Sequence, residues 1–118
     1  MDTFENLGFW QKSHQLTLKI YEMTRNFPNE EKFGITSQLR RATSSVPANI
    51  TEGYARKSKL EKARFFNIAL SSLEEARYFL ILSRDLKLIN NFEDMNLQIV
   101  EIRKMIGSYT TMLKNSKV

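Results

Sequence analysis

The sequence contains no cysteine among its 118 residues, and it has only four glycines, two prolines and one histidine. The lack of cysteine excludes disulfide bonds, thiolate zinc sites and cysteine nucleophiles. Glycine and proline are the residues that most often interrupt helices, so their scarcity favours long helices. We therefore expect a helical protein of a reducing compartment, and the cytoplasm is the simplest location.

Long hydrophobic runs are also missing, since no stretch approaches the roughly 20 apolar residues that a membrane-spanning helix needs. The opening MDTFENLGFW has neither the basic start nor the apolar centre of a signal peptide. Hydrophobic residues make up 42% of the chain and charged residues 26%, which is typical of a compact globular protein. We predict a single domain over residues 1–118 that neither spans nor binds a membrane.

Catalytic and cofactor-binding motifs are absent as well. No glycine-rich phosphate loop occurs, and His14 has no carboxylates at the spacing of a helical metal site. The serines at 44–45 and 71–72 have no histidine or lysine base arranged in a known motif. The adjacent Glu74 and Glu75 would point in different directions on a helix and could not share a substrate. We therefore predict that the protein is not an enzyme and binds no metal or cofactor.

What the sequence does contain is four segments in which apolar residues recur at spacings of three and four, the pattern of amphipathic helices. The expected helices run from Trp10 to about Phe27, from Thr36 or Ser37 to Tyr54, from Ser58 to about Leu86, and from Met95 to Leu113. The third and fourth keep the alternation most strictly, as the seam of a bundle does. Their expected seams are Phe66, Ala69, Leu73, Ala76, Leu80 and Ser83, and Met95, Ile99, Ile102, Ile106, Tyr109 and Leu113.

Hydroxyl residues stand where two of these helices should begin. Ser58 and Glu61 have the spacing of a capping box, in which each side chain bonds a free backbone amide of the other residue. The hydroxyl of Thr36 or Ser37 could cap the second helix in the same general way.

Pro47 lies inside the second helix and leaves the carbonyl of Thr43 without its usual amide partner. We expect a kink or a break there. Because short connections make sequential helices pack antiparallel, we predict an all-α, up-down-up-down antiparallel four-helix bundle whose second helix is kinked at Pro47.

The third helix also carries apolar residues that lie outside its seam. Apolar surface that the core does not bury indicates a subunit interface. These residues are Leu60, Phe65, Ile68, Leu70 and Ile81.

The net charge of +5 comes from one region, because residues 37–64 hold seven basic and two acidic side chains while the rest of the chain is balanced. Tyr54, Phe65 and Phe66 lie among these cations, and basic groups beside aromatic rings can follow a phosphate backbone while bases stack. The alternative is an ordinary solvated helix start. The candidate nucleic-acid-binding residues are Arg40, Arg41, Arg56, Lys57, Lys59, Lys62 and Arg64.

A polar stripe runs along the second helix, formed by Arg41, Ser45, Asn49, Glu52 and Arg56. It could bind a ligand or RNA. The interpretation we favour is structural: Asn49 and Glu52 satisfy groups freed at the proline, or pair across a subunit interface.

The string SSVPANITEG at residues 44–53 resembles a signature of the four-helix-bundle proteins encoded in intervening sequences of bacterial 23S rRNA genes. That signature is Ser-(Ile or Val)-Pro-x-Asn-Ile-x-Glu-Gly, and it is matched by Ser45, Val46, Pro47, Asn49, Ile50, Glu52 and Gly53. FENLGFWQKS, FPNEEKFGITSQLRRA and FFNIALSSLEEA are also similar to the family, so the likeness covers about residues 4–90. Thr51 stands where the family usually has alanine, and Ser71 where it often has glycine.

The family is similar in architecture to the accessory proteins of diversity-generating retroelements, which form pentameric rings and bind nucleic acid together with a reverse transcriptase. The resemblance implies a homopentamer whose partner is RNA or a nucleic-acid-handling protein. In this interpretation Ser45, Pro47, Asn49, Glu52 and Gly53 are structural or interface residues. We therefore predict a non-enzymatic, ring-forming RNA-associated protein.

Two alternatives remain. The first is an oligomeric scaffold that contacts another protein and binds no nucleic acid. The second, which is less favoured, is a metal-independent nuclease or other enzyme that uses Glu52 and Arg56.

Overall fold

The computed structural model describes residues 3–115, and within them the secondary structure is entirely helical. The four α-helices are α1 (Gly8–Thr24), α2 (Ile35–Ala55), α3 (Lys59–Asp85) and α4 (Phe92–Asn115). Two short 3-10 helices, η1 (Phe4–Asn6) and η2 (Asn29–Glu31), precede α1 and α2.

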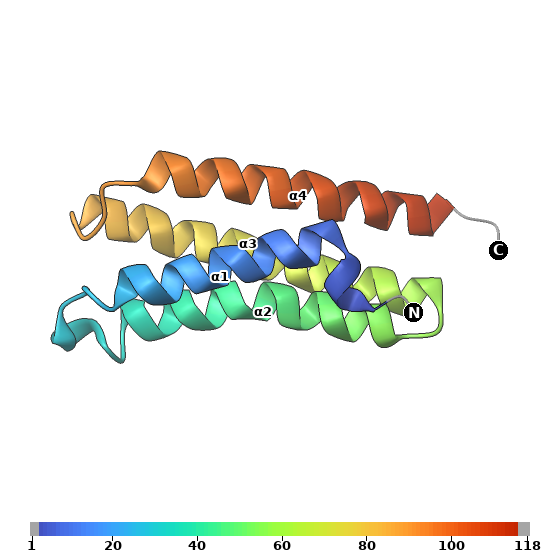
Figure 1. Cartoon of the computed structure of the whole chain (residues 1–118), viewed down its shortest axis with the longest axis horizontal. Helices are drawn as coiled ribbons and strands as arrows, with labels where there is room; N and C mark the ends of the chain where they lie inside the picture. Colours follow the sequence, from blue (N-terminus) through green and yellow to red (C-terminus); the bar gives the residue numbers. More distant parts are fainter. Residues whose placement is uncertain (1–2, 116–118) are drawn as a thin grey trace.

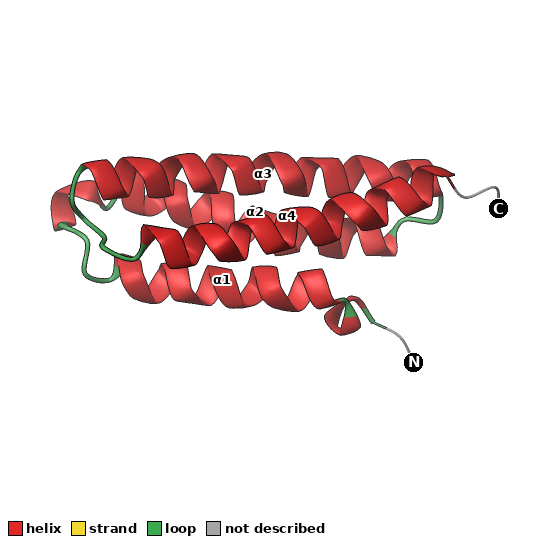
Figure 2. Ribbon diagram, turned by 90° about the horizontal axis from the view of Figure 1, so that it is seen from above, coloured by secondary structure: helices red, strands yellow, loops and turns green. Residues whose placement is uncertain are grey.

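The helices form the predicted up-down-up-down antiparallel bundle (Figures 1 and 2). Each helix packs against its neighbour in sequence, α1 also contacts α4, and the α2–α3 pair has the most extensive contact. The described part of the chain measures 50 × 22 × 21 Å. Figure 1 shows the α1–α2 and α3–α4 connections at one end and the short α2–α3 turn at the other.

The core draws on all four helices, and the seams of α3 and α4 lie in it largely as predicted. All six predicted α3 residues are buried, with Ala63 extending the same row. On α4 five of the six are buried, whereas Tyr109 is half-buried and Thr110 occupies the buried position beside it. The Thr110 hydroxyl donates to the Ile106 carbonyl at 2.8 Å, which explains how a polar residue is tolerated there.

Helix α1 begins two residues before the expected start and buries Phe9 rather than Trp10. Trp10 is half-buried between Phe4 and His14, and its indole nitrogen donates to the Thr51 hydroxyl at 3.1 Å. The helix ends at Thr24, so Phe27 reaches the core from the following turn.

One of the two predicted caps is present. The Ser58 hydroxyl accepts a hydrogen bond from the Glu61 amide at 3.0 Å, which is one of the two hydrogen bonds of the predicted capping box. The predicted cap of α2 by Thr36 or Ser37 is wrong, because the helix begins at Ile35 and both residues lie inside its first turn. The Glu31 carboxylate, positioned by η2, accepts from the Ile35 amide at 3.3 Å instead.

Helix α2 continues through Pro47 without the break that we considered, while a kink at this residue stays a prediction. The carbonyl of Thr43 lies 3.3 Å from the Thr17 hydroxyl of α1. That hydroxyl also lies 2.8 Å from the Ser13 carbonyl, so its single proton is shared between two acceptors. The group freed by the proline is therefore satisfied from α1, and not by Asn49 or Glu52 as we had expected.

The apolar surface left over on α3 is smaller than predicted. Leu70 and Ile81 pack against the core, and Phe65 is half-buried. Only Leu60 and Ile68 of this set are exposed, at 80% and 38%. Within residues 3–115, no helix combines the length and the apolar character required for a transmembrane span.

Candidate nucleic-acid interface

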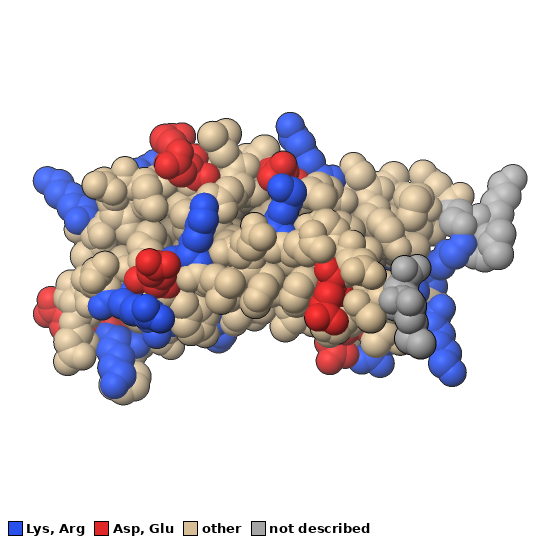
Figure 3. All heavy atoms as spheres, viewed as in Figure 1, with Lys and Arg blue, Asp and Glu red and all other residues tan. Residues whose placement is uncertain are grey.

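The α2–α3 turn gathers five of the seven predicted basic residues at one end of the bundle. Arg56 follows the last residue of α2, Lys57 lies in the turn, and the other three occupy the first two turns of α3. Between residues 52 and 64 they face only two carboxylates, those of Glu52 and Glu61. Figure 3 shows basic side chains projecting from this end of the molecule. We refer to Arg56, Lys57, Lys59, Lys62 and Arg64 as the basic turn.

Arg40 and Arg41 do not belong to this cluster, because Arg40 precedes Arg56 by sixteen positions, which correspond to about 24 Å of helix. Arg40 donates to the Thr24 hydroxyl at 2.7 Å and the Tyr21 carbonyl at 3.2 Å, and its guanidinium lies 4.7 Å from the Tyr21 ring centroid. These contacts join α2 to the end of α1. The sequence prediction therefore combined two separate sites.

Two arginines of the basic turn share one aromatic ring. The guanidinium carbons of Arg56 and Arg64 lie 4.7 Å and 5.3 Å from the centroid of Phe65. Arg56 pairs with Glu52 at 2.8 Å and Arg64 with Glu61 at 3.5 Å, yet their side chains remain 43% and 64% exposed. Cation–π contact with the ring restricts the two guanidinium groups while leaving them accessible to a phosphate.

Lys62 has a structural role that the sequence interpretation missed. Its ammonium group donates to the Tyr54 carbonyl at 2.7 Å, lies 3.5 Å from the Gly53 carbonyl, and sits 5.4 Å from the Tyr54 ring centroid. A cation here satisfies the Tyr54 carbonyl in the last turn of α2 and complements the helix dipole. The short α2–α3 connection was the available signal, because it brings the first turn of α3 beside the last turn of α2.

The remaining lysines of the basic turn flank the capping serine. Lys57 is exposed and Lys59 is half-buried, and Ser58 between them bonds the Glu61 amide. Positive charge at the start of α3 opposes the dipole of that helix.

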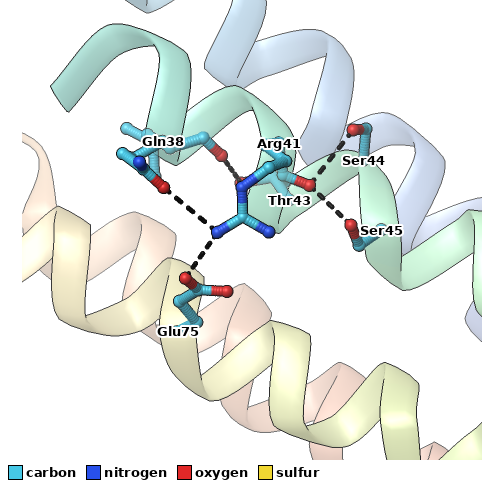
Figure 4. A network of polar contacts seen from close by, with 7 residues as sticks. Gln38, Arg41, Thr43, Ser44, Ser45 and Glu75 are labelled. Atoms are coloured by element: carbon cyan, nitrogen blue, oxygen red, sulfur yellow. Dashed lines mark hydrogen bonds and ion pairs between the residues drawn. The ribbon is translucent and has the colours of Figure 1, made fainter. Parts of the chain in front are cut away.

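Arg41 forms the centre of a polar network between α2 and α3 (Figure 4). Its guanidinium donates to Glu75 at 2.6 Å and to Gln38 at 3.1 Å. Its backbone carbonyl accepts from the hydroxyls of Ser45 at 2.7 Å and Ser44 at 3.3 Å. Arg41 therefore links the two helices rather than extending the basic turn.

The rest of the polar stripe is satisfied largely within α2. The Asn49 amide donates to the Ser45 carbonyl at 2.8 Å, one turn earlier, and Glu52 pairs with Arg56 one turn later. These contacts support the structural interpretation of the stripe, although the partner groups differ from those freed by Pro47.

Gly53 allows α3 to approach α2 closely beneath the basic turn. A Cβ atom at this position would lie 2.7 Å from Cε1 of Phe66 and 3.1 Å from Cβ of Phe65. Phe66 is 1% exposed, so its ring has little room to move. The glycine of the 44–53 motif thus positions the two phenylalanines, one in the core and one under the arginines.

A shallow apolar groove of about 640 Å³ adjoins the basic turn, between the first half of α3 and the end of α4. Leu60, Ala63 and Ile68 provide apolar lining, while Arg64 of α3 and Lys114 of α4 supply cations. We call this the α3–α4 groove. Among residues 3–115, no three histidine, aspartate or glutamate side chains are grouped so that they could hold a metal ion.

Comparison with known proteins gives a family and a solved relative. The family model described as 23S rRNA-intervening sequence protein matches residues 5–108. The chain is also similar to a crystal structure from Bacteroides thetaiotaomicron, described as a protein with unknown function from the S23 ribosomal protein family. The two share 28% sequence identity over 87% of this chain and 95% of the other, with a TM-score of 0.81. No curated protein matches the sequence.

Proposed function

Because the chain belongs to the 23S rRNA-intervening sequence protein family, we propose that it is a cytoplasmic, non-enzymatic RNA-binding protein that assembles into a ring of identical subunits. The observation that carries the RNA-binding part is the basic turn, where five cations face two carboxylates at one end of the bundle. Arg40 and Arg41 are not included, because their contacts hold α2 to α1 and α3.

The chemistry of the basic turn suits phosphate groups. Arg56 and Arg64 offer planar donors restrained by Phe65, and within residues 3–115 each is paired with one exposed carboxylate. Exposed ion pairs are worth little, about 0–1 kcal/mol, so a phosphate can displace the carboxylate at small cost. Lys57 adds an exposed cation between the two helices.

The assembly part is supported by apolar side chains that lie outside the α3–α4 groove. Leu18 of α1, Tyr78 of α3, and Leu97 and Met112 of α4 are each more than half exposed. Large exposed apolar side chains on several helices are expected where subunits meet.

RNA binding can be tested by replacing Lys57, Lys59 and Arg64 together with glutamine. Each lost phosphate contact should reduce the slope of log affinity against log salt by about 0.7 on a single strand. Affinity for a single-stranded oligoribonucleotide would be measured by fluorescence anisotropy at several salt concentrations. Lys62 is left unchanged, because its ammonium group caps α2.

A matched control replaces Lys19, Arg25 and Lys104 with glutamine, which removes the same charge from exposed positions outside the basic turn. The control should keep the wild-type salt slope, and circular dichroism should give the same helical content for all three proteins. Wild-type protein that binds no RNA, or two triple variants with equal slopes, would contradict the proposal.

The second candidate function is a scaffold that contacts another protein. It is favoured by Phe33, which lies in the α1–α2 connection with 89% of its surface exposed. Aromatic residues, phenylalanine included, are enriched in the cores of protein interfaces. If the wild-type protein shows no salt-dependent RNA binding, the protein-binding scaffold becomes the favoured function.

A further inference from the structure

The α3–α4 groove joins an apolar surface to the cations of the basic turn. Leu60 is 80% exposed and Ile68 is 38% exposed, while Ala63 between them is buried. Such apolar area on an otherwise charged helix start is unfavourable in water unless something covers it. The volume of about 640 Å³ lies within the range of roughly 300–1,000 Å³ that is typical of small-molecule sites.

Cations from two helices stand beside this apolar surface. Arg64 belongs to both the groove and the Phe65 cluster, and Lys114 approaches from the end of α4. Glu61 also lines the groove, where its carboxylate can accept from an amino group, and it lies 3.5 Å from Arg64. An occupant should therefore have a flat apolar part, hydrogen-bond donors at its edge, and a negatively charged part outside.

Building on the RNA-binding role proposed above, we infer that the α3–α4 groove receives an unpaired base of a single-stranded RNA. The base covers Leu60 and Ile68, and the adjoining phosphates lie against Arg64 and Lys114. Bases in a duplex are stacked and paired, so their faces cannot enter a groove on a protein surface, whereas unpaired bases can be splayed out. The charge complementarity between phosphate and the cations Arg64 and Lys114 distinguishes this occupant from an apolar helix, which offers no anionic group to either cation.

The inference can be tested with two probes of equal charge, a single-stranded oligoribonucleotide and an abasic oligonucleotide of the same length. The variant Leu60→Ala/Ile68→Ala removes apolar contact without changing charge. We expect it to weaken binding of the intact strand about tenfold and to leave the abasic strand unaffected. A matched control, Leu86→Ala, removes an exposed apolar side chain at the opposite end of α3 and should change neither affinity.

The outcomes separate this inference from the function on which it rests. If wild-type protein binds neither probe, the RNA-binding proposal fails and this inference with it. If wild-type protein binds both probes, and the Leu60→Ala/Ile68→Ala variant weakens both equally or neither, only the groove assignment is overturned. A change in subunit number in that variant, measured by light scattering, would also overturn it, because a second copy would then cover the groove.

Discussion

At the scale of single residues, Thr17 allows a proline inside a continuous helix. Pro47 has no amide hydrogen to give to Thr43, and the Thr17 hydroxyl lies 3.3 Å from that carbonyl in a buried position. An unsatisfied buried carbonyl costs free energy, so the α1 hydroxyl offsets part of the cost of the proline. The signature residue Pro47 thus depends on a threonine thirty positions earlier in the sequence.

We predict that Thr17→Val lowers the free energy of unfolding by about 1–3 kcal/mol, because valine keeps the shape and removes the donor. In a Pro47→Ala background the alanine amide can donate to the Thr43 carbonyl. Thr17→Val should therefore lower the free energy of unfolding by less in that background. Urea denaturation of the four proteins of this double-mutant cycle would measure the coupling. Equal costs in the two backgrounds would show that Thr17 does not act through Thr43.

At the scale of elements, the α2–α3 turn combines stabilising and destabilising charges within a few residues. Ser58 caps α3, and Lys62 reaches back from α3 to cap α2. Lys57 lies next to the positive end of the α3 dipole, where a cation is unfavourable. Two lysines only five positions apart, Lys57 and Lys62, therefore have opposite effects on stability.

Lys62 differs from the other lysines of the basic turn, because its ammonium group contacts backbone carbonyls of α2. Lys62→Met should lower the free energy of unfolding by about 1 kcal/mol, since the Tyr54 carbonyl of α2 loses its donor. Lys57→Met is the matched control and should change it by less than about 0.5 kcal/mol. Thermal denaturation of both variants would check this, and a Lys62 variant as stable as wild type would contradict the capping role.

At the scale of the whole molecule, we predict a homo-oligomer, most simply a pentamer, in keeping with the resemblance described for the sequence. Five copies of the 13.8 kDa chain would have a mass of about 69 kDa. Multi-angle light scattering at micromolar concentration would measure it. A particle with the mass of one chain would contradict the prediction, and each particle would then carry a single basic turn.

The main features of the fold could be predicted from the sequence, because they depend on local patterns. Buried positions on α3 and α4 follow from the three-and-four spacing, and the Ser58 cap follows from its distance to Glu61. The antiparallel order follows from short connections. The first and last residues of the helices were harder to predict. At the start of α2, the Glu31 carboxylate accepts from the Ile35 amide, and neither Thr36 nor Ser37 caps the helix.

The division of the basic residues was decided only by the tertiary structure. Arg40, Arg41 and Lys62 look in the sequence like members of one charged region, but helix packing places each against acceptors of another element. A cation is available to a partner only if no other helix brings a hydrogen-bond acceptor within about 3 Å of it. The distance between two helices cannot be predicted from the spacing of residues within one of them. The sequence by itself determined that positive charge is concentrated between residues 37 and 64, and the packing of four helices determined which part of that charge a partner can reach.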